Sequence, residues 1–550
     1  MALEQDIAFP TLNEPNLAAL AARGHLREVR AGEVLFAEGD RNRSFFVVLE
    51  GSIEIVGHTR GEARVVAVHH PGQFTGDVDM LSGRAILVTG SAAEDGRVIE
   101  LSNAELRRAV DELPELGEIL VKAFLTRRSL LIGGEFEGIT ILGSRFSPDS
   151  HRLRDFATRN GVPYRWIDLD TDQEADALLR QFNIPASATP IVLGSDGEWV
   201  SNPSIADFAR CMGMEATLEP DHVYDLVVVG AGPAGLAASV YAASEGLDVL
   251  TVDALAAGGQ AGTSSRIENY LGFPAGISGA ELTRNALLQA QKFGATITVG
   301  APVRSLGLDG GERVVTLADG TRLRTRCVLV ASGVEYRKLD VPGFGDFEGA
   351  GIYYAATEME ARLCRDEEVV VVGAGNSAGQ AIMFLTRYAS RVHVVVRGRD
   401  LGDSMSRYLV DRVERLDKVT IYRNTAVTAL EGNGHLDAVR VRTSDGSERS
   451  FDTSSLYLFI GADPNTSWLA GCVELDRKGF VLTGNGLPPA VADTERWGVA
   501  GRAPFLLETS LPGVFAAGDV RSGSAKRVAA AVGEGAMAVS FVHAYINRPV

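Results

Sequence analysis

Two short glycine-rich motifs, each placed directly after an apolar run, constrain this chain more than any other feature. The first lies within VVVGAGPAGLAA, and the second, later in the chain, lies within VVVVGAGNSAGQA. Each pattern is typical of a buried parallel strand, a tight turn and the start of a helix. Glycines in such a turn let the backbone approach a pyrophosphate, and the helix N-terminus offers it free N–H groups.

The residues of the two motifs predict two dinucleotide sites. The first set is Gly230, Gly232, Pro233, Ala234 and Gly235. The second set is Gly373, Gly375, Asn376, Ser377 and Ala378, with the alanine in the third glycine position. One such turn also occurs as plain structure, but two in strand–turn–helix context indicate a pair of dinucleotides brought together, as in a flavoprotein reductase.

Composition excludes several other classes of protein. A chain of 550 residues is too long for one hydrophobic core, so about three or four domains are expected. The formal net charge of −18 argues against nucleic-acid binding. No membrane-spanning apolar run and no signal-peptide pattern stand out, so a cytoplasmic location is expected. The four cysteines include no CxxC pair, which predicts reduced, largely buried thiols and no metal site.

Residues 25 to about 105 alternate short β-rich runs with turns, a pattern typical of an antiparallel barrel or jelly roll. A helix is expected to follow from Ser102 to about Leu131, with Ser102 or Asn103 as its cap, and the whole domain is expected to span residues 1–132. The segment resembles the cyclic-nucleotide-binding domain through Gly32-Glu33, Glu38-Gly39-Asp40 and FTGDVDMLSGRAIL. This resemblance implies a cyclic nucleotide as a possible effector.

The resemblance places the phosphate-binding cassette at Gly76, Asp77, Arg84 and Ala85. Arg84 would pair with the cyclic phosphate, and Asp77 would accept a hydrogen bond from the ribose. The acid is an aspartate where the family has glutamate, and its spacing from the arginine is shorter than usual. A barrel that binds nothing and only mediates contacts therefore remains an alternative.

Residues 137–214 run as strand, helix, strand, helix, strand and helix, and resemble a glutaredoxin-like thioredoxin fold. Thr189-Pro190 stands where that family carries its cis-proline, and Ser147 and Ser150 occupy both redox cysteine positions. A serine hydroxyl cannot form a disulfide, so dithiol exchange is excluded and a docking or spacer role is predicted.

From Tyr224 onward the chain resembles the low-molecular-weight thioredoxin reductase family. The resemblance implies two Rossmann-like, three-layer α/β domains: an FAD domain made of residues 221–336 and 456–550, and an inserted NAD(P)H domain of residues 337–455. Besides the first motif, it places FAD contacts at Asp253, Gly259, Gln260, Asn269, Ala331, Gly333, Gly518, Asp519, Lys526, Arg527 and Val528. Asp253 would bind a ribose of the cofactor, and Asp519 would bind the ribityl chain of the flavin.

Two arginines follow the second strand of the inserted domain, where an NAD-specific site usually has an acid. Arg397 and Arg399 are suited to the 2′-phosphate of NADPH, although Gly398 separates them. Exposed arginines that bind no ligand are the alternative.

The family's redox pair, CATC, is missing just before the second motif. The aligned residues run from Ala355 to Glu358, so both sulfurs are absent and the flavin cannot reduce thioredoxin by the family's route. Cys364 lies nearby, but a single thiol is more often a core residue than a catalytic one.

These observations predict a multidomain FAD-dependent NAD(P)H oxidoreductase that passes hydride from NADPH to FAD and on to a non-dithiol acceptor. The resemblance implies a homodimer, and the cyclic-nucleotide-binding-like domain suggests regulation. Three alternatives remain: a disulfide reductase that uses cysteines of a partner protein, a flavin-based redox sensor, and a scaffold without flavin.

Overall fold

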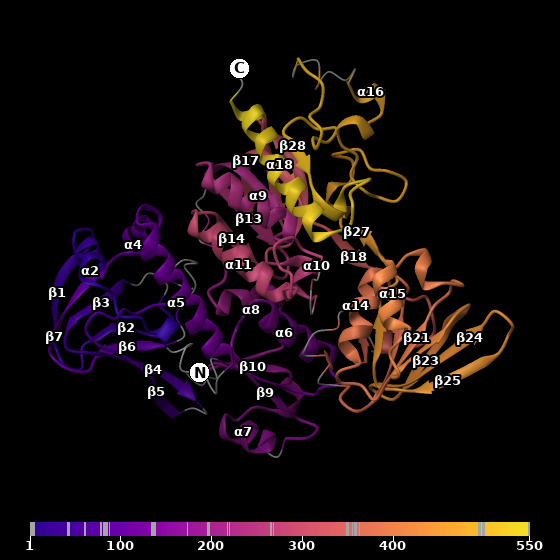
Figure 1. Ribbon diagram of the computed structural model, residues 1–550, viewed down its shortest axis with the longest axis horizontal. Helices are drawn as coiled ribbons and strands as arrows, with labels where there is room; N and C mark the ends of the chain where they lie inside the picture. The colour runs from indigo at the N-terminus through magenta and orange to yellow at the C-terminus, as the bar shows by residue number, and fades with distance from the viewer. Residues whose placement is uncertain are drawn as a thin grey trace.

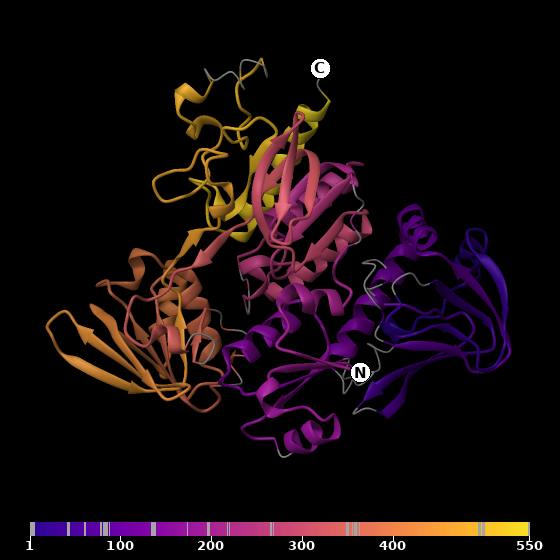
Figure 2. The same ribbon diagram turned by 180° about the vertical axis from the view of Figure 1, so that it is seen from behind.

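The computed structural model describes residues 6–40, 44–59, 62–77, 80, 86, 88–133, 139–172, 174–194, 198–216, 218, 221–264, 267, 269–347, 351–354, 356, 360–361, 364–492, 497 and 501–547. Four units are visible in Figure 1: an N-terminal unit in indigo, a middle unit in purple, and two larger units. We name the larger units the FAD unit and the NADPH unit, after the dinucleotide assigned to each. The middle unit lies between the N-terminal and NADPH units and beside the FAD unit in both views (Figures 1 and 2).

The N-terminal unit consists of two antiparallel sheets followed by two helices. One sheet has the strand order β1-β7-β3 and the other β2-β6-β4-β5. The elements are α2 (Glu14–Ala21), β1 (His25–Val29), β2 (Val34–Phe36), β3 (Phe45–Glu50), β4 (Ile53–Thr59), β5 (Glu62–His69), β6 (Thr89–Ala92), β7 (Gly96–Leu101), α4 (Asn103–Glu112) and α5 (Pro114–Gly133). The rings of Phe45, Phe74 and Phe124 meet in the core and fix α5 against the sheets.

The prediction of a single helix after the β-rich region is wrong, because the structure has two helices there, α4 and α5. Of the two expected cap residues, Ser102 is the one that caps α4, through a capping box with Glu105. The helix then ends at Leu113, because Pro114 has no N–H to continue the hydrogen-bond ladder and instead begins α5.

The middle unit is a four-stranded sheet with helices packed on it. Its strand order is β11-β10-β8-β9, with β8 parallel to β9 and antiparallel to β10. The elements are β8 (Ile139–Gly143), α6 (Pro148–Arg159), β9 (Tyr164–Asp168), α7 (Ala175–Gln181), η1 (Ala186–Ala188), β10 (Ile191–Gly194), β11 (Trp199–Ser201) and α8 (Ile205–Cys211). The Thr189-Pro190 peptide bond is cis.

The FAD unit is built on a parallel sheet, β14-β13-β12-β17, extended by β28 next to β17 and by the antiparallel strands β16 and β15. Its first part contains β12 (Val223–Val229), α9 (Pro233–Ser244), β13 (Val249–Asp253), α10 (Gly259–Gly262), α11 (Gly279–Lys292), β14 (Thr296–Val299), β15 (Val303–Asp309), β16 (Glu312–Leu317) and β17 (Arg322–Val330). Its second part contains η3 (Ser467–Leu469), η4 (Gly484–Gly486), α16 (Pro489–Ala492), β28 (Val514–Ala516), η5 (Gly518–Val520) and α18 (Val528–Ile546).

The central strand β12 is buried on both faces. Leu226 and Val228 pack with α9 and α18, whereas Val227 and Val229 pack in a second core on the other face. Side chains alternate along a strand, so a continuous apolar run is the pattern expected for a sheet covered on both sides.

The NADPH unit combines a parallel sheet, β19-β26-β20-β21-β22, with a three-stranded antiparallel sheet, β23-β24-β25. Its elements are α12 (Phe344–Phe347), β19 (Ile352–Tyr353), β20 (Glu368–Val372), α14 (Asn376–Leu385), β21 (Arg391–Val395), η2 (Leu401–Asp403), α15 (Arg407–Val413), β22 (Val419–Tyr422), β23 (Thr425–Gly432), β24 (Leu436–Thr443), β25 (Glu448–Asp452) and β26 (Leu456–Leu458).

The expected boundary at residue 456 is too early, because β26 pairs with β20 inside the NADPH unit. The chain returns to the FAD unit through β27 (Ala462–Pro464). This strand pairs antiparallel with β18 (Val334–Tyr336), the outgoing connection. The β18–β27 ribbon therefore carries both chain crossings between the two units.

Helix α18 corrects the expectation that no segment is apolar enough to span a membrane. Among the described residues it is one helix with sufficient length and hydropathy. Ala531, Ala538, Val539 and Val542 on this helix are buried in a core that includes residues of α9. Length and composition alone therefore do not separate a spanning helix from this core helix.

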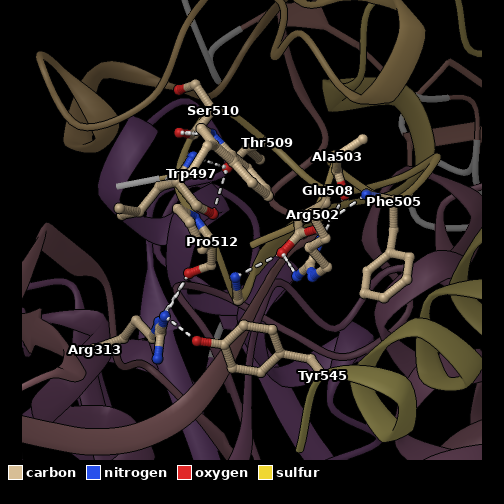
Figure 3. A network of polar contacts seen from close by, with 12 residues as sticks. Arg313, Trp497, Arg502, Ala503, Phe505, Glu508, Thr509, Ser510, Pro512 and Tyr545 are labelled. Carbon is tan, nitrogen blue, oxygen red and sulfur yellow. Dashed lines mark hydrogen bonds and ion pairs between the residues drawn. The ribbon is translucent and has the colours of Figure 1, made fainter. Parts of the chain in front are cut away.

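A buried polar network holds the segment before β28 in place (Figure 3). Glu508 accepts hydrogen bonds from Arg502 and from the backbone amides of Phe505 and Gly513. The guanidinium of Arg502 lies 4.0 Å from the ring centroid of Phe505. Every oxygen of the buried carboxylate is thus paired, which a buried charge requires.

Candidate functional site

The first glycine turn requires glycine at two positions. Gly230 has a φ of 106°, and a Cβ there would come within 2.3 Å of the carbonyl oxygen of Ala331. A Cβ on Gly235 would come within 1.8 Å of the Gly230 carbonyl oxygen. Gly232 caps α9 and Pro233 occupies its first turn, so the free N–H groups of α9 lie directly after the turn.

Asp253 lies beside this turn, at the end of the neighbouring strand. Its Oδ2 accepts a hydrogen bond of 2.8 Å from the amide of Ala231, and its Oδ1 accepts from the amides of Leu255 and Ala256. That Asp253 binds a ribose of the cofactor stays a prediction. The three backbone bonds orient the carboxylate before any ribose binds.

A second glycine segment closes over the first turn. A Cβ on Gly259 would lie 2.9 Å from the Cα of Gly232, so the two backbones nearly touch. Gln260 donates to the carbonyl of Val334 at 3.4 Å, and Gly333, with a φ of 64°, turns the chain toward β18. Asn269 lies on an exposed bend, and no described contact ties it to these residues.

Gly518 and Asp519 reach the same region from the C-terminal part of the chain. The amide of Gly518 donates to Glu534 at 2.7 Å. Burial raises the pKa of Asp519, while the positive charge of Lys526 opposes this shift. No hydrogen bond from another described residue satisfies the Asp519 carboxylate. Such a group fits a ligand that donates hydroxyl hydrogen bonds.

The remaining residues assigned to FAD flank Asp519. The Nζ of Lys526 lies 4.3 Å from the ring centroid of Phe480. Arg527 is the N-cap of α18 and Val528 is its first residue. Sequence reasoning missed Glu534, which binds Arg521 as well as the Gly518 amide. Its spacing from Arg521 along the chain is the only signal that could have indicated this pair.

The second glycine turn has the same construction as the first. Gly373 has a φ of 144°, and a Cβ there would lie 2.4 Å from the carbonyl oxygen of Phe459. Gly375 caps α14, and Asn376 begins the helix and accepts a hydrogen bond of 2.7 Å from the amide of Ser406. Ser377 is exposed on the first turn of the helix, where it can meet a ligand.

Ala378 takes the third glycine position and is fully buried in the core of the NADPH unit. The next residue, Gly379, is the one at which a neighbouring side chain comes too close for a Cβ atom. A Cβ on Gly379 would lie 2.9 Å from the Sδ of Met405.

Arg397 and Arg399 follow β21, the parallel neighbour of β20, and so lie at the same edge of the sheet as the second glycine turn. Both residues are exposed, and neither has an ion pair with another described residue. Two unpaired guanidinium groups beside a dinucleotide turn are suited to an additional phosphate.

Ala355 and Glu358, the residues predicted to stand at the redox cysteine positions, lie outside the described residues. On the side preceding them, the rings of Tyr354 and Tyr336 stack at 5.3 Å with an interplanar angle of 2°. Cys364 is fully buried and its Sγ donates to the carbonyl of Ala361. Burial raises the pKa of this thiol, which disfavours the reactive thiolate.

The prediction of largely buried thiols is only partly right. Cys327 and Cys364 are buried, and burial raises the pKa of Cys327 to about 12, but Cys211 is exposed at the end of α8. Among the described residues no cluster of His, Cys, Asp or Glu could hold a metal ion.

In the N-terminal unit, two predicted cassette residues contact α5, whereas Arg84 and Ala85 lie outside the described residues. Arg127 donates to the carbonyl of Gly76 at 2.6 Å, and Arg128 lies 3.5 Å from the Asp77 carboxylate. Burial lowers the pKa of Arg127 to about 9. The carboxylate predicted to face a ribose therefore already faces a protein cation.

The two glycine turns, the acid beside the first and the arginines beside the second define a two-dinucleotide oxidoreductase. Residues 224–535, more than half of the chain, match the model for the pyridine nucleotide-disulphide oxidoreductases, and the chain belongs to that family. Residues 26–112 match the cyclic nucleotide-binding domain.

Relatives within the family are thioredoxin reductases. That of Mycolicibacterium smegmatis is 34% identical over 317 residues, 58% of this chain and 94% of the relative. That of Bacillus subtilis is 32% identical over 333 residues, 60% of this chain and 97% of the relative. The solved structure of T. acidophilum thioredoxin reductase is 28% identical, with a TM-score of 0.52, over 59% of this chain and 99% of that one.

Family membership makes this chain an FAD-dependent NAD(P)H oxidoreductase of the thioredoxin reductase type, with FAD and NADPH as cofactors. The unpaired Asp519 and the two glycine turns fit these cofactors.

Proposed function

We propose that this protein transfers electrons from NADPH, through FAD, to a non-dithiol acceptor, that is, to a small molecule or protein that is not reduced at a disulfide. The observation that carries the proposal is the combination of two intact dinucleotide turns with a chain that has no CxxC pair. Cys364, the cysteine nearest the aligned redox position, is fully buried. The chain thus retains the parts that bind and orient cofactors and lacks the family's dithiol relay.

Each residue has a binding role in this proposal. The N-terminus of α9 and Asp253 hold the pyrophosphate and ribose of FAD, and Asp519 accepts hydrogen bonds from its ribityl chain. When bound, FAD accepts hydride from the nicotinamide and releases electrons to the acceptor. Arg397 and Arg399 give a preference for NADPH over NADH, because they are free to pair with the 2′-phosphate.

The two units that precede the FAD unit have supporting roles in the proposal. The strand order of the middle unit and its cis Thr189-Pro190 bond support a thioredoxin-like fold. Ser147 and Ser150 stand at its former redox positions, so the unit serves in docking. The N-terminal unit is a regulatory domain, for which a cyclic nucleotide is the candidate effector.

Contact between cassette and helix supports the regulatory role of the N-terminal unit. A nucleotide that engages Asp77 would compete with Arg128 on α5, and α5 leads toward the middle unit. We further propose a cytoplasmic homodimer, by analogy with the family.

An acceptor screen on the purified protein tests the proposal. Under anaerobic conditions NADPH should bleach the flavin, and a quinone, oxygen or another small acceptor should restore its colour. Thioredoxin should not be turned over, because the family's relay is missing. Restoring cysteine with Ala355→Cys and Glu358→Cys should introduce thioredoxin reduction, and turnover of thioredoxin by the unmodified protein would contradict the proposal.

The same screen separates the alternatives. Reduction of a disulfide substrate to its dithiol by the unmodified protein would indicate a disulfide reductase that uses a partner's cysteines. Flavin reduction without turnover on any acceptor would indicate a redox sensor, and a colourless protein would indicate a scaffold.

A further inference from the structure

Helix α6 of the middle unit lies across the junction between the FAD and NADPH units. Its residues contact the FAD unit at one end and the NADPH unit at the other. In Figure 1 the helix lies below the FAD unit and beside the NADPH unit.

The C-terminal end of α6 is hydrogen-bonded to the glycine segment that packs against the first dinucleotide turn. Arg159 donates to the carbonyl of Gly259 at 3.1 Å, and Asn160 donates to the carbonyl of Leu255 at 3.2 Å. Gly259 is the residue whose backbone nearly touches Gly232 in the first dinucleotide turn. This end of α6 therefore supports the backbone that packs against the first dinucleotide turn.

A shared apolar core strengthens the attachment to the FAD unit. Val299 of β14 is buried in one cluster with Phe208 and Ala209 of α8, and Leu255 packs against the same cluster. A Cβ on Gly300 would lie 2.8 Å from the Cβ of Ala209, so the two units are in direct backbone contact there. Separating the middle unit from the FAD unit would expose this apolar surface to water, which costs free energy and therefore stabilises the attachment.

Among the described residues, the N-terminal end of α6 touches the NADPH unit through ring contacts and a long ion pair. Phe146, just before the helix, stacks on His435 at 4.3 Å. His151 lies 5.6 Å from the ring of Tyr353 and its Nε2 lies 3.9 Å from the carboxylate of Glu360. The Nε2 atom is buried without a hydrogen bond, so this contact is incompletely satisfied.

The middle of α6 faces the ribbon that joins the two units. Asp155 lies one turn from both His151 and Arg159, so the three residues share one face of the helix. Burial raises the pKa of Tyr336 in β18, and the charges of Arg159, which lowers it, and of Asp155, which raises it, make smaller contributions. Helix α6 thus extends from the first dinucleotide turn of the FAD unit, near the β18–β27 ribbon, to the NADPH unit.

We propose that α6 is a latch, anchored on the FAD unit and releasable from the NADPH unit, which restrains the turning of the NADPH unit about the β18–β27 ribbon. The latch rests on the proposed electron transfer from NADPH to FAD, during which the NADPH unit would reorient about the β18–β27 ribbon that carries both chain crossings. Any such reorientation breaks the stacking of Phe146 on His435 and the approach of His151 to Glu360. Weakening these contacts therefore lowers the barrier to turning.

Phe146→Ala in the full-length holoprotein tests the latch, because it removes the stacking and leaves the pair of His435 and Asp437 intact. The rate of flavin reduction by NADPH, measured anaerobically by stopped flow, should rise about fivefold or more, the lower end of typical couplings. Arg152→Ala is the matched control on the same helix, since Arg152 bonds to Asn202 and to the carbonyl of Pro203 within the middle unit. It should leave the rate unchanged.

A double-mutant cycle and hydrogen exchange complete the test. Phe146→Ala and His435→Ala should be non-additive, because the two rings contact each other. In Phe146→Ala, amides of residues 351–354 should exchange faster, while those of 255–259 keep their protection. Rates equal to wild type, or additive effects of the two substitutions, would overturn the latch.

Different experimental outcomes would contradict the proposed function and the latch. If NADPH does not reduce the flavin in the wild type, the proposed function fails and hydrogen exchange alone decides on the latch. If NADPH reduces the flavin but Phe146→Ala behaves like Arg152→Ala, only the latch is wrong. His151→Gln, which keeps a polar side chain, repeats the test with a smaller change in packing.

Discussion

Gly518 packs against Ala234 so closely that a Cβ on Gly518 would lie 3.0 Å from the Ala234 Cβ. Gly518 has a φ of 79°, so glycine is favoured there by the backbone as well as by the available space. This contact joins the C-terminal part of the chain to the start of α9. It brings Asp519, which has no hydrogen bond from another described residue, beside the first dinucleotide turn.

Asp519→Ala should weaken retention of FAD. The substitution removes hydrogen bonds to the ribityl chain, each worth about 0.5–1.5 kcal/mol, or about two- to tenfold in affinity. Dialysis against increasing denaturant, followed by flavin absorbance, measures the loss. Asp519→Asn keeps one acceptor and should lie between the two, whereas equal retention by all three proteins would refute the role of Asp519.

Arg397→Ala should narrow the preference for NADPH over NADH. A charge-assisted hydrogen bond to the 2′-phosphate is worth about 1.5–3 kcal/mol, and its loss should raise the KM for NADPH without affecting NADH. Arg391→Ala, at the opposite end of β21, is the control and should change neither value. Equal kcat/KM for both nucleotides in the wild type would remove the basis of this prediction.

Glu508→Gln should lower the free energy of unfolding by about 3–5 kcal/mol, because it leaves the buried cation of Arg502 without a counter-ion. Glu508 is fully buried, and Arg502 is 8% exposed in its side chain. Chemical denaturation measures the effect. The control is Glu448→Gln in the exposed pair with Arg442, which should cost less than about 1 kcal/mol. Similar losses in both variants would show that burial does not determine the strength of these pairs.

Cyclic AMP or cyclic GMP should bind to the full-length protein with measurable heat, and Arg84→Ala should abolish it. Binding should change the rate of flavin reduction, since allosteric couplings are typically about 1–3 kcal/mol. Titration calorimetry on the wild type and on Arg84→Ala checks the first step. Absence of heat with either nucleotide at millimolar concentration would leave the N-terminal unit as an interaction module.

The two dinucleotide turns could be predicted because their physics is local. A buried strand, glycines with restricted space and a helix start all lie within about a dozen residues, so their pattern is visible in the sequence. The capping box of Ser102 and Glu105 is predictable for the same reason. The break between α4 and α5 could also have been predicted from Pro114, because proline has no N–H for the helix ladder. The apolar residues on both sides nevertheless follow one helical periodicity.

The order of the units, both glycine turns and the absence of a CxxC pair can be read from the sequence alone. By contrast, the support of Gly259 by Arg159, the stacking of Phe146 on His435 and the approach of Arg128 to Asp77 became visible in the folded chain. These contacts join residues that are far apart in the chain, and their energy depends on shape and burial at the meeting surfaces. No local pattern of residue types carries that information, because the same side chains would be solvated if the units packed differently.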